Sequence, residues 1–538
     1  MLLDGRKLPK NEILETDVCI VGGGAAGITL AKKFVDAHFK VSLFESGGLK
    51  FNHQTQFLYK ADNFGRHYYD MEFTKQRYFG GATNKWYGRC RPLDPIDFET
   101  RPWVKHSGWP FEKKHLDRYY VRAHDVCQLK SDNYNPSFWE TREKEQLPLQ
   151  GTKIETKIFQ FSPPTRFGKE YINLLERAKN IKVFLYSNAV SVATNSVGNI
   201  VTHVNFATLR GKNFRVKAKI FILAASALEV TRLLLISNDV HSRGIGNHYD
   251  LVGRFFMEHP HVFTSVLTTP LKIKQARFYK ILDYDIDSVN LGTVGALGLN
   301  EKTIRHEKML NASAFFIRRK GYKIDNRYFS KGGVALTQLM DTLNHSNAPG
   351  MQFFRYAGDT LKHINEVSGI IKQRLKAVIN PTSWITVRTQ TETAPNPDSR
   401  VTLSHKKDRL GMNKLILDWR LTELDLISFK KFNQILFEGL LNAGYKVRLF
   451  NHETDEFGWP VSMVAGKHHM GTTRIHEDPK KGVLDADCKV HGVENLFIAG
   501  SSMFPSSGQA NPMLTIVALA IRLADHIKQI MSDVSSFE

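Results

Sequence analysis

Residues 16–45 read TDVCIVGGGAAGITLAKKFVDAHFKVSLFE, and this stretch decides the fold. A β-branched run leads into three glycines. A segment of helical character follows, and then a second apolar run that ends at Glu45. Strand, glycine turn, helix and strand within about 30 residues predict a βαβ unit that binds a dinucleotide.

The residue types in this unit match that chemistry. Gly22 permits the tight turn, Gly24 lets the backbone approach a pyrophosphate, and Gly27 lets the helix pack on the strand. The start of the helix offers free N–H groups to the phosphates. A carboxylate at Glu45 would bind a ribose 2′-hydroxyl and repel a 2′-phosphate, which argues against NADP. The motif leaves NAD and FAD open, and a glycine-rich turn in an unrelated α/β sheet is the alternative.

The length of the chain predicts two domains, because 538 residues exceed the roughly 250–300 that one core supports. Four cysteines without a CxxC pair exclude a disulfide scaffold and a zinc ribbon, and no spacing typical of a metal site stands out. No apolar run approaches the roughly 20 residues of a membrane span. The N-terminus lacks the apolar segment of a secretory signal. We therefore expect a cytoplasmic protein without a metal.

The chain is strongly basic, with 74 Lys and Arg against 53 Asp and Glu, a net charge of +21. This charge can steer anionic substrates, favour an anionic membrane or serve solubility alone. Nucleic-acid binding is not expected, because the charge is spread along the chain and no nucleic-acid motif is present. Residues 361–378 predict a helix with Lys362, Lys372, Arg374 and Lys376 on one face. Such a helix contacts a membrane or, more commonly, covers a sheet with a solvated basic face.

Seven motifs in order then identify a family resemblance. They are VGGGAAG with Glu45, FGGATNKW at 79–86, ILAASALE at 222–229, LVGRFFMEHP at 251–260, PNPDSRVTL at 395–403, HHMGTTR at 468–474 and LFIAGSSMFPSSGQANPMLT at 496–515. Together they resemble the glucose-methanol-choline (GMC) flavoprotein oxidoreductases. The resemblance implies an α/β fold, with a Rossmann-like FAD-binding domain built from several segments. An α+β substrate domain with a mostly antiparallel sheet completes it.

The pattern of predicted strands and helices supports this division into two domains. Alternating strands predicted at 263–269, 312–319, 383–390, 400–405 and 414–420 suggest one mostly antiparallel sheet, with a helix at 422–444. The expected segments are 1–98, 171–261 and 462–538 for the FAD domain, 99–170 for an excursion or lid on the substrate side, and 262–461 for the substrate domain.

The resemblance also assigns site residues. It implies that His468 is the base and that Asn511 is its partner at the substrate oxygen. Lys85 stands where sugar-oxidising relatives carry a flavin-linking histidine, so non-covalent FAD is expected. The expected cofactor contacts are Gly22, Gly24, Ala25, Ala26, Gly27, Glu45, Ser46, Gly81, Thr83, Asn84, Val190, Ala224, Gly500, Ser501, Pro512 and Met513.

The chemistry of alcohol oxidation suits these residue types. A histidine with a pKa of about 6.5 accepts a hydroxyl proton near neutral pH, and the flavin accepts a hydride. The structural alternatives are a buried histidine bonded to backbone for His468 and a helix N-cap for Asn511. His259 and His261 are interpreted as structural.

We therefore expect an FAD-dependent enzyme that oxidises an alcohol group, with a lean towards a sugar or polyol. The basic charge allows an anionic substrate, and the electron acceptor is oxygen, a quinone or a redox protein. One alternative is a lyase or decarboxylase on the same fold without net alcohol oxidation. Another is a dehydrogenase subunit that passes electrons onward at a membrane surface.

Overall fold

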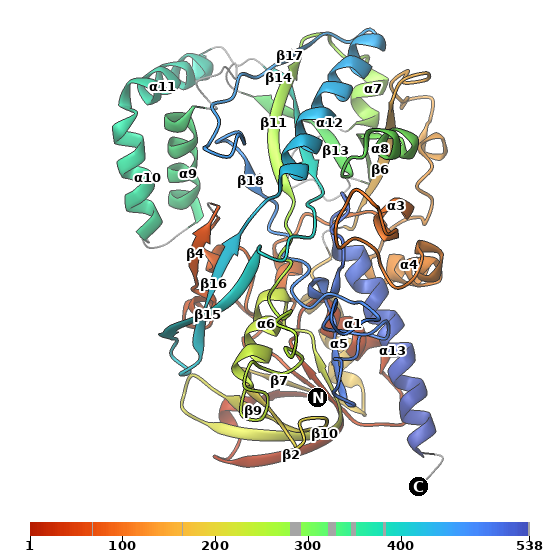
Figure 1. Cartoon of the computed structure of the whole chain (residues 1–538), viewed down its shortest axis with the longest axis vertical. Helices are drawn as coiled ribbons and strands as arrows, with labels where there is room; N and C mark the ends of the chain where they lie inside the picture. Colours follow the sequence, from red (N-terminus) through yellow and green to blue (C-terminus); the bar gives the residue numbers. More distant parts are fainter. Residues whose placement is uncertain are drawn as a thin grey trace.

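A computed structural model gives the fold, with two large sheets at opposite ends of the molecule (Figure 1). The structure describes residues 1–66, 68–163, 165–279, 292–320, 330–345, 351–379 and 383–535. The expected fold class is confirmed, with one sheet of Rossmann type and a second antiparallel sheet.

The first sheet carries the βαβ unit of residues 16–45. Its strand order is β1 (Leu2–Asp4), β7 (Ile181–Leu185), β3 (Val41–Phe44), β2 (Glu12–Val21), β10 (Asn213–Leu223), β9 (Val201–Ala207) and β8 (Asn188–Thr194), and β19 (Leu496–Ile498) pairs with β10. Within this order β1, β7, β3, β2 and β10 run parallel to one another, and β19 runs parallel to β10. Segments from the start, middle and end of the chain therefore meet in one sheet.

Helices close this sheet and meet at its carboxyl edge. Helix α1 (Ala25–Lys33) packs against the long C-terminal helix α13 (Met513–Ser535), which also contacts α4 (Lys113–Cys127). Every residue of α13 from Leu514 to Ala524 is buried apart from the half-buried Ile516, so the first half of this helix is packed inside the domain. Two further helices beside this sheet are α5 (Phe167–Arg177) and α6 (Ala227–Ile236).

The second sheet is antiparallel throughout the strand pairs described. Its order is β17 (Val447–Leu449), β11 (Pro260–Leu267), β14 (Ser383–Thr391), β13 (Ala312–Lys320), β12 (Thr293–Leu299), β6 (Ile154–Phe161) and β5 (Arg89–Cys90), with β18 (Val464–Ala465) beside β11. One face packs on α12 (Glu423–Asn442) through Phe432, Ile435 and Leu436. The opposite face points towards the first domain.

Two local expectations were wrong. Strands β15 (Arg400–Lys407) and β16 (Asn413–Trp419) do not join the second sheet but pair with β4 (Asp62–Gly65) in a separate sheet. The helix expected over 361–378 is divided between α10 (Met351–Lys362) and α11 (Ile364–Ile379). The side chains of Arg374 and Lys376 lie outside the described residues. Further helices are α2 (His53–Gln56), α3 (Pro95–Phe98), α7 (Ile273–Phe278), α8 (Glu301–Glu307) and α9 (Lys331–His345).

We retain the five expected chain segments as a proposal for the domain boundaries. Within them, the short strand β5 and the strand β6 precede residue 171 and yet belong to the second sheet. The substrate-side domain therefore draws its edge strands from the early part of the chain.

A buried polar network joins the two domains. Arg101 is fully buried, and its Nη1 donates to Glu392 Oε2 at 2.9 Å while Nη2 donates to Oε1. Glu392 Oε2 also accepts from the backbone N–H of Asn311 at 2.8 Å, and Asn311 Nδ2 donates to Asp97 Oδ1 at 3.0 Å. Ser506 donates to the carbonyl of Asp97. The network thus anchors the loop that leads into α13.

Substitution of one partner tests this anchor. We expect Arg101→Met to lower the free energy of unfolding by about 3–5 kcal/mol, because it leaves the Glu392 carboxylate buried without its counterion. Denaturant titration followed by tryptophan fluorescence measures the change. The matched control, Asp117→Asn in the exposed pair Lys113–Asp117, should change it by only about 0–1 kcal/mol. Equal effects of the two substitutions would contradict the anchoring role.

Candidate active site

A cleft lies at the carboxyl edge of the first sheet, between the starts of α1 and α13. It is bounded by β2, β3, the turn after β10 and the loop before α13. Most of the expected cofactor contacts line it, namely Gly22, Gly24, Ala25, Ala26, Glu45, Ser46, Gly81, Ala224, Gly500, Ser501 and Met513. Four segments far apart in sequence therefore meet around one elongated space.

Five expected contacts are not among the residues that line the cleft. A Cβ at Gly27 would lie 1.9 Å from the carbonyl oxygen of Gly22, so this glycine serves helix–strand packing. Thr83 Oγ1 donates to the carbonyl of Gly80, and Asn84 Nδ2 donates to that of Phe79, so both side chains hold the loop. The remaining two are Val190, whose neighbour Ala189 lines the cleft instead, and Pro512, which is buried before α13.

Sequence reasoning missed several lining residues. Lys75, Gln76 and Arg77 directly precede the Gly80-Gly81 loop, and that proximity was the available signal. Arg77 Nη1 donates to Glu229 Oε2 at 2.8 Å, which fixes a buried charge pair at the wall. Burial lowers the pKa of Lys75 to about 8. The other missed members are Val21, Phe44, Tyr59, Ala82, Ser187, Ala189, Ala225, Ser226, Glu229, Leu233, Met412, Ala499 and Ile516.

The cleft has the features that a dinucleotide requires. A Cβ built at Gly24 or at Gly500 meets nothing within 4 Å, so the backbone is bare on the side of the open space. Gly24 caps α1 without any side-chain hydrogen bond, so the first N–H groups of that helix are left for a ligand. Glu45 is buried and accepts from the N–H of Gly23 at 2.9 Å and of Gly47 at 2.8 Å. The residues present therefore fit the pyrophosphate and ribose of FAD.

His468 and Asn511 meet next to this cleft. Asn511 Nδ2 lies 3.0 Å from His468 Nε2, although the residues are 43 positions apart. Asn511 Oδ1 has no hydrogen-bond partner among the described residues, so this side chain does not cap α13. His469 lies on the other side of its segment, with Nε2 2.8 Å from the hydroxyl of Tyr68. The pair expected from the sequence is thus brought together in space.

His259 and His261 also face His468, contrary to the expectation that they are merely structural. The Nδ1 atoms of His259 and His468 are 2.9 Å apart, and the ring centroids of His261 and His468 are 6.1 Å apart. Both come from the start of β11, where alternate residues share a face. The spacing of the two histidines in MEHPH was therefore a usable signal.

The buried carboxylate of Glu258 connects these segments. It accepts from the backbone N–H of His468 at 2.7 and 2.9 Å and from that of His259 at 2.8 Å. The hydroxyl of Tyr68 donates to its second oxygen. Burial raises the pKa of this carboxyl. The loop that carries His468 is therefore tied to the strand that carries His259.

Burial keeps the histidines of the site neutral. It lowers the pKa of His468 and of His261 well below the usual value, and neighbouring cations add to the effect. The pKa of His259 falls to about 4 for the same reason. A neutral imidazole has one bare nitrogen, which is what a proton acceptor needs.

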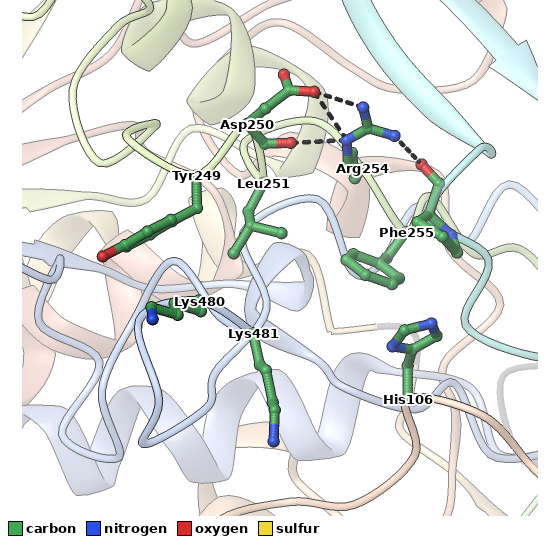
Figure 2. Close-up of a pocket in the computed structure, with 9 residues that line it drawn as sticks. His106, Tyr249, Asp250, Leu251, Arg254, Phe255, Lys480 and Lys481 are labelled. Atoms are coloured by element: carbon green, nitrogen blue, oxygen red, sulfur yellow. Dashed lines mark hydrogen bonds and ion pairs between the residues drawn. The ribbon is translucent and has the colours of Figure 1, made fainter.

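Figure 2 shows a second pocket, whose lining residues include none of these histidines. In the wall of this pocket, the guanidinium of Arg254 donates hydrogen bonds to the carboxylate of Asp250, so these two opposite charges are already paired. None of the expected site residues lines it, and we assign it no catalytic role. Its lining residues are His106, Tyr249, Asp250, Leu251, Arg254, Phe255, Pro397, Lys480 and Lys481.

Two further kinds of feature are absent from the described part of the chain. Within it, no helix is both long enough and apolar enough to cross a membrane. No three His, Cys, Asp or Glu side chains of the described residues group as ligands for a metal ion.

Comparison with known proteins identifies the family. The sequence model described as GMC oxidoreductase matches residues 395–520, which include both His468 and Asn511. Relatives that align over nearly the whole chain support this match. By these matches the chain is similar to the GMC oxidoreductases.

The individual relatives of this chain are distant in sequence. It is 24% identical to the fructose dehydrogenase large subunit of Gluconobacter japonicus, over 65% of this chain and 55% of that relative. It is 23% identical to the 6'''-hydroxyparomomycin C oxidase of Streptomyces lividus, over 95% and 92%. Among solved structures, pyridoxine 4-oxidase from Mesorbium loti shares the fold, with a TM-score of 0.56, 16% identity and coverage of 95% and 98%.

FAD is the cofactor of this family, and the cleft has the residues to hold it. Gly22, Gly24 and the start of α1 would hold the pyrophosphate, and Glu45 the ribose. The start of α13 would lie at the flavin end, where Met513 lines the cleft close to Asn511.

Filling the open space at Gly24 tests this assignment. We expect Gly24→Val to weaken FAD binding at least about 10-fold, because the side chain occupies the space that the pyrophosphate needs. The extended backbone at this position accepts valine without strain. Titration of the apoprotein with FAD, followed by flavin fluorescence, measures the affinity. Gly358→Val is the control, since Gly358 also has nothing within 4 Å but lies in α10; equal affinities of the two variants would contradict the assignment.

Proposed function

We propose that this GMC oxidoreductase oxidises an alcohol group of a sugar or polyol, with His468 as proton acceptor. The observation that carries the proposal is the contact of 3.0 Å between His468 Nε2 and Asn511 Nδ2, two residues before Met513 of the cofactor cleft. An acceptor and a donor side by side suit a hydroxyl group, which donates to one and accepts from the other.

His468 and Asn511 have different roles in this reaction. A bare ring nitrogen of His468 would accept the hydroxyl proton, and the amide N–H of Asn511 would donate to the same oxygen as its negative charge develops. The FAD of the family, when bound, supplies the acceptor for the hydride. The N-terminus of α13 adds a positive dipole end beside the flavin region of the cleft.

Unpartnered polar atoms near His468 favour a substrate with several hydroxyl groups. His261 Nε2, Gln390 Oε1 and Asn511 Oδ1 are buried and have no hydrogen-bond partner among the described residues. His261 and Gln390 are register partners across β11 and β14, on the face that His468 approaches. Buried polar groups need partners, and the hydroxyls of a sugar would supply them. The names of two relatives, a fructose dehydrogenase large subunit and a 6'''-hydroxyparomomycin C oxidase, support this class.

We further propose that FAD is bound without a covalent link. Lys85 occupies the position of the flavin-linking histidine, and its Nζ stands 6.0 Å from the ring centroid of Phe51. We do not favour the lyase or decarboxylase alternative. A proton acceptor on His468 and a hydrogen-bond donor on Asn511, placed side by side, already suit the hydroxyl group of an alcohol.

Removal of the base tests the proposal. We expect His468→Ala to slow flavin reduction by the alcohol substrate about 10²–10⁴-fold, measured by anaerobic stopped-flow absorbance. In the wild-type enzyme the acid limb of the rate profile should lie well below the ordinary histidine pKa, because burial lowers the pKa of His468 and keeps its ring neutral.

The control is His491→Ala, whose ring contacts the carbonyl of His476 outside the cleft. In this variant the alcohol substrate should reduce the flavin at the wild-type rate. An unchanged rate in His468→Ala, or an acid limb near the ordinary histidine pKa of about 6.5, would oppose the assigned role.

A second observation bears on the electron acceptor and on membrane contact. Helices α10 and α11 project from the body in Figure 1, and apolar side chains on them are unusually exposed. Phe354 is 65% exposed and Leu361 69%, seven residues apart on one face of α10, and the two helices also carry Lys362 and Lys372. Apolar and basic side chains together suit an anionic lipid surface. We propose that the enzyme contacts such a membrane here, where a quinone acceptor would be found.

Vesicle binding tests this contact. We expect the wild-type protein to cosediment with phosphatidylcholine vesicles that contain phosphatidylglycerol, and the double variant Phe354→Ser, Leu361→Ser to lose at least about 10-fold in affinity. Phe138→Ser, at another exposed phenylalanine, should bind as the wild type does. Absence of wild-type binding at low salt would contradict the proposal.

A further inference from the structure

The polar atoms around His468 form a chain whose hydrogen positions can be derived. His259 Nε2 lies 2.9 Å from the carbonyl oxygen of Gly508, and the Nδ1 atoms of His259 and His468 are 2.9 Å apart. His468 Nε2 then lies 3.0 Å from Asn511 Nδ2. Every contact in the chain is at hydrogen-bond distance, so each must contain one hydrogen.

The carbonyl end of the chain fixes the first hydrogen. A carbonyl oxygen only accepts, so the hydrogen between Gly508 and His259 is on Nε2 of His259. His259 is fully buried and its pKa is about 4, so the ring is neutral and its Nδ1 is bare. The next hydrogen must therefore lie on Nδ1 of His468.

The other end of the chain agrees independently. With one hydrogen on Nδ1, a neutral His468 has a bare Nε2. The atom of Asn511 that faces Nε2 is the amide nitrogen, which only donates. The opposite tautomer of His468 would set two lone pairs against each other at Nδ1 and two N–H groups against each other at Nε2. The arrangement thus admits one tautomer.

We infer that His259 is a positioning residue that holds the hydrogen of His468 on Nδ1, so that Nε2 is the atom that takes the substrate's proton. This inference rests on the proposed function. In that step the substrate O–H bond breaks, an N–H bond forms at Nε2, and the electron pair stays on the substrate oxygen. The bare Nδ1 of His259 then accepts from the imidazolium that forms and stabilises its charge.

Surrounding groups hold the two rings in this relation. Glu258 accepts from the backbone N–H of both histidines, so their segments cannot slide past each other. The other charged or titratable groups that act on His468 are His261 from β11, Lys75 from the loop before Gly80 and the adjacent His469. Each of these lowers the pKa of His468 and so favours the neutral ring that the chain requires.

Two variants separate the tautomer from packing. In His259→Asn the side-chain oxygen stands near the position of Nδ1 and can still accept from His468. In His259→Leu nothing accepts, and the hydrogen of His468 is free to move to Nε2. His124→Leu removes a buried histidine in α4 that contacts the carbonyl of Tyr120, and it is the control for loss of packing alone.

The experiment is ¹⁵N NMR of the ring nitrogens in FAD-loaded protein with labelled histidine, with His468 assigned from the His468→Asn variant. Protonated and bare nitrogens have distinct shifts. We expect a protonated Nδ1 and a bare Nε2 in the wild type, in His259→Asn and in His124→Leu. In His259→Leu we expect a shift of the population towards protonated Nε2. A protonated Nε2 in the wild type, or an unchanged His468 in His259→Leu, would overturn the inference.

Flavin reduction gives a second readout. We expect His259→Leu to slow reduction about 10²-fold, as loss of the correct tautomer removes the base. His259→Asn should restore most of the rate, which a purely structural role would not explain. If no alcohol reduces the wild-type flavin, the proposed function fails, but the NMR result still decides the role of His259. If the wild type is reduced and all the variants match it, the inference alone fails.

Discussion

The buried carboxylate of Glu258 is the interaction on which the site depends. It accepts backbone hydrogen bonds from His259 and His468, residues that lie 209 positions apart, and a third hydrogen bond from the hydroxyl of Tyr68. A buried carboxylate without such partners would be strongly unfavourable. The loop of the base, the first residues of β11 and the segment after β4 are therefore constrained to one arrangement.

The wider fold brings the remaining parts to this point. The first sheet ends at a cleft beside the uncapped start of α1, and α13 begins at the same cleft with Met513, two residues after Asn511. The second sheet presents His261 and Gln390 from neighbouring strands. The Arg101–Glu392 pair holds the loop before α13 against the second domain. Cofactor, base and substrate groups thus come from different segments whose positions are set by buried polar contacts.

The sequence predicts the parts whose signal is local. The glycines at 22–27 and the carboxylate at 45 stand within one βαβ unit, so their spacing alone indicates the cleft. The resemblance then assigned His468 and Asn511, which the structure places 3.0 Å apart. The antiparallel second sheet followed from alternation along each strand.

The parts that were missed depend on contacts between distant segments. His259 looked structural because the spacing of the histidines in MEHPH indicates only a face shared with His261, and the contact with His468 joins residues 209 positions apart. Pairing of β16 with β4 joins residues more than 300 positions apart, and alternation does not say which sheet a strand joins. Thr83 and Asn84 turn their side chains to the backbone of their own loop, which only the three-dimensional turn decides.

The most direct test of the account is an anaerobic titration of the FAD-loaded protein with a panel of sugars, polyols and simple alcohols, followed by the visible absorbance of the flavin. The account predicts that a sugar or polyol bleaches the flavin and that the colour returns when a suitable electron acceptor is added. A protein that takes up no FAD, or a flavin that stays oxidised with every compound, would contradict it.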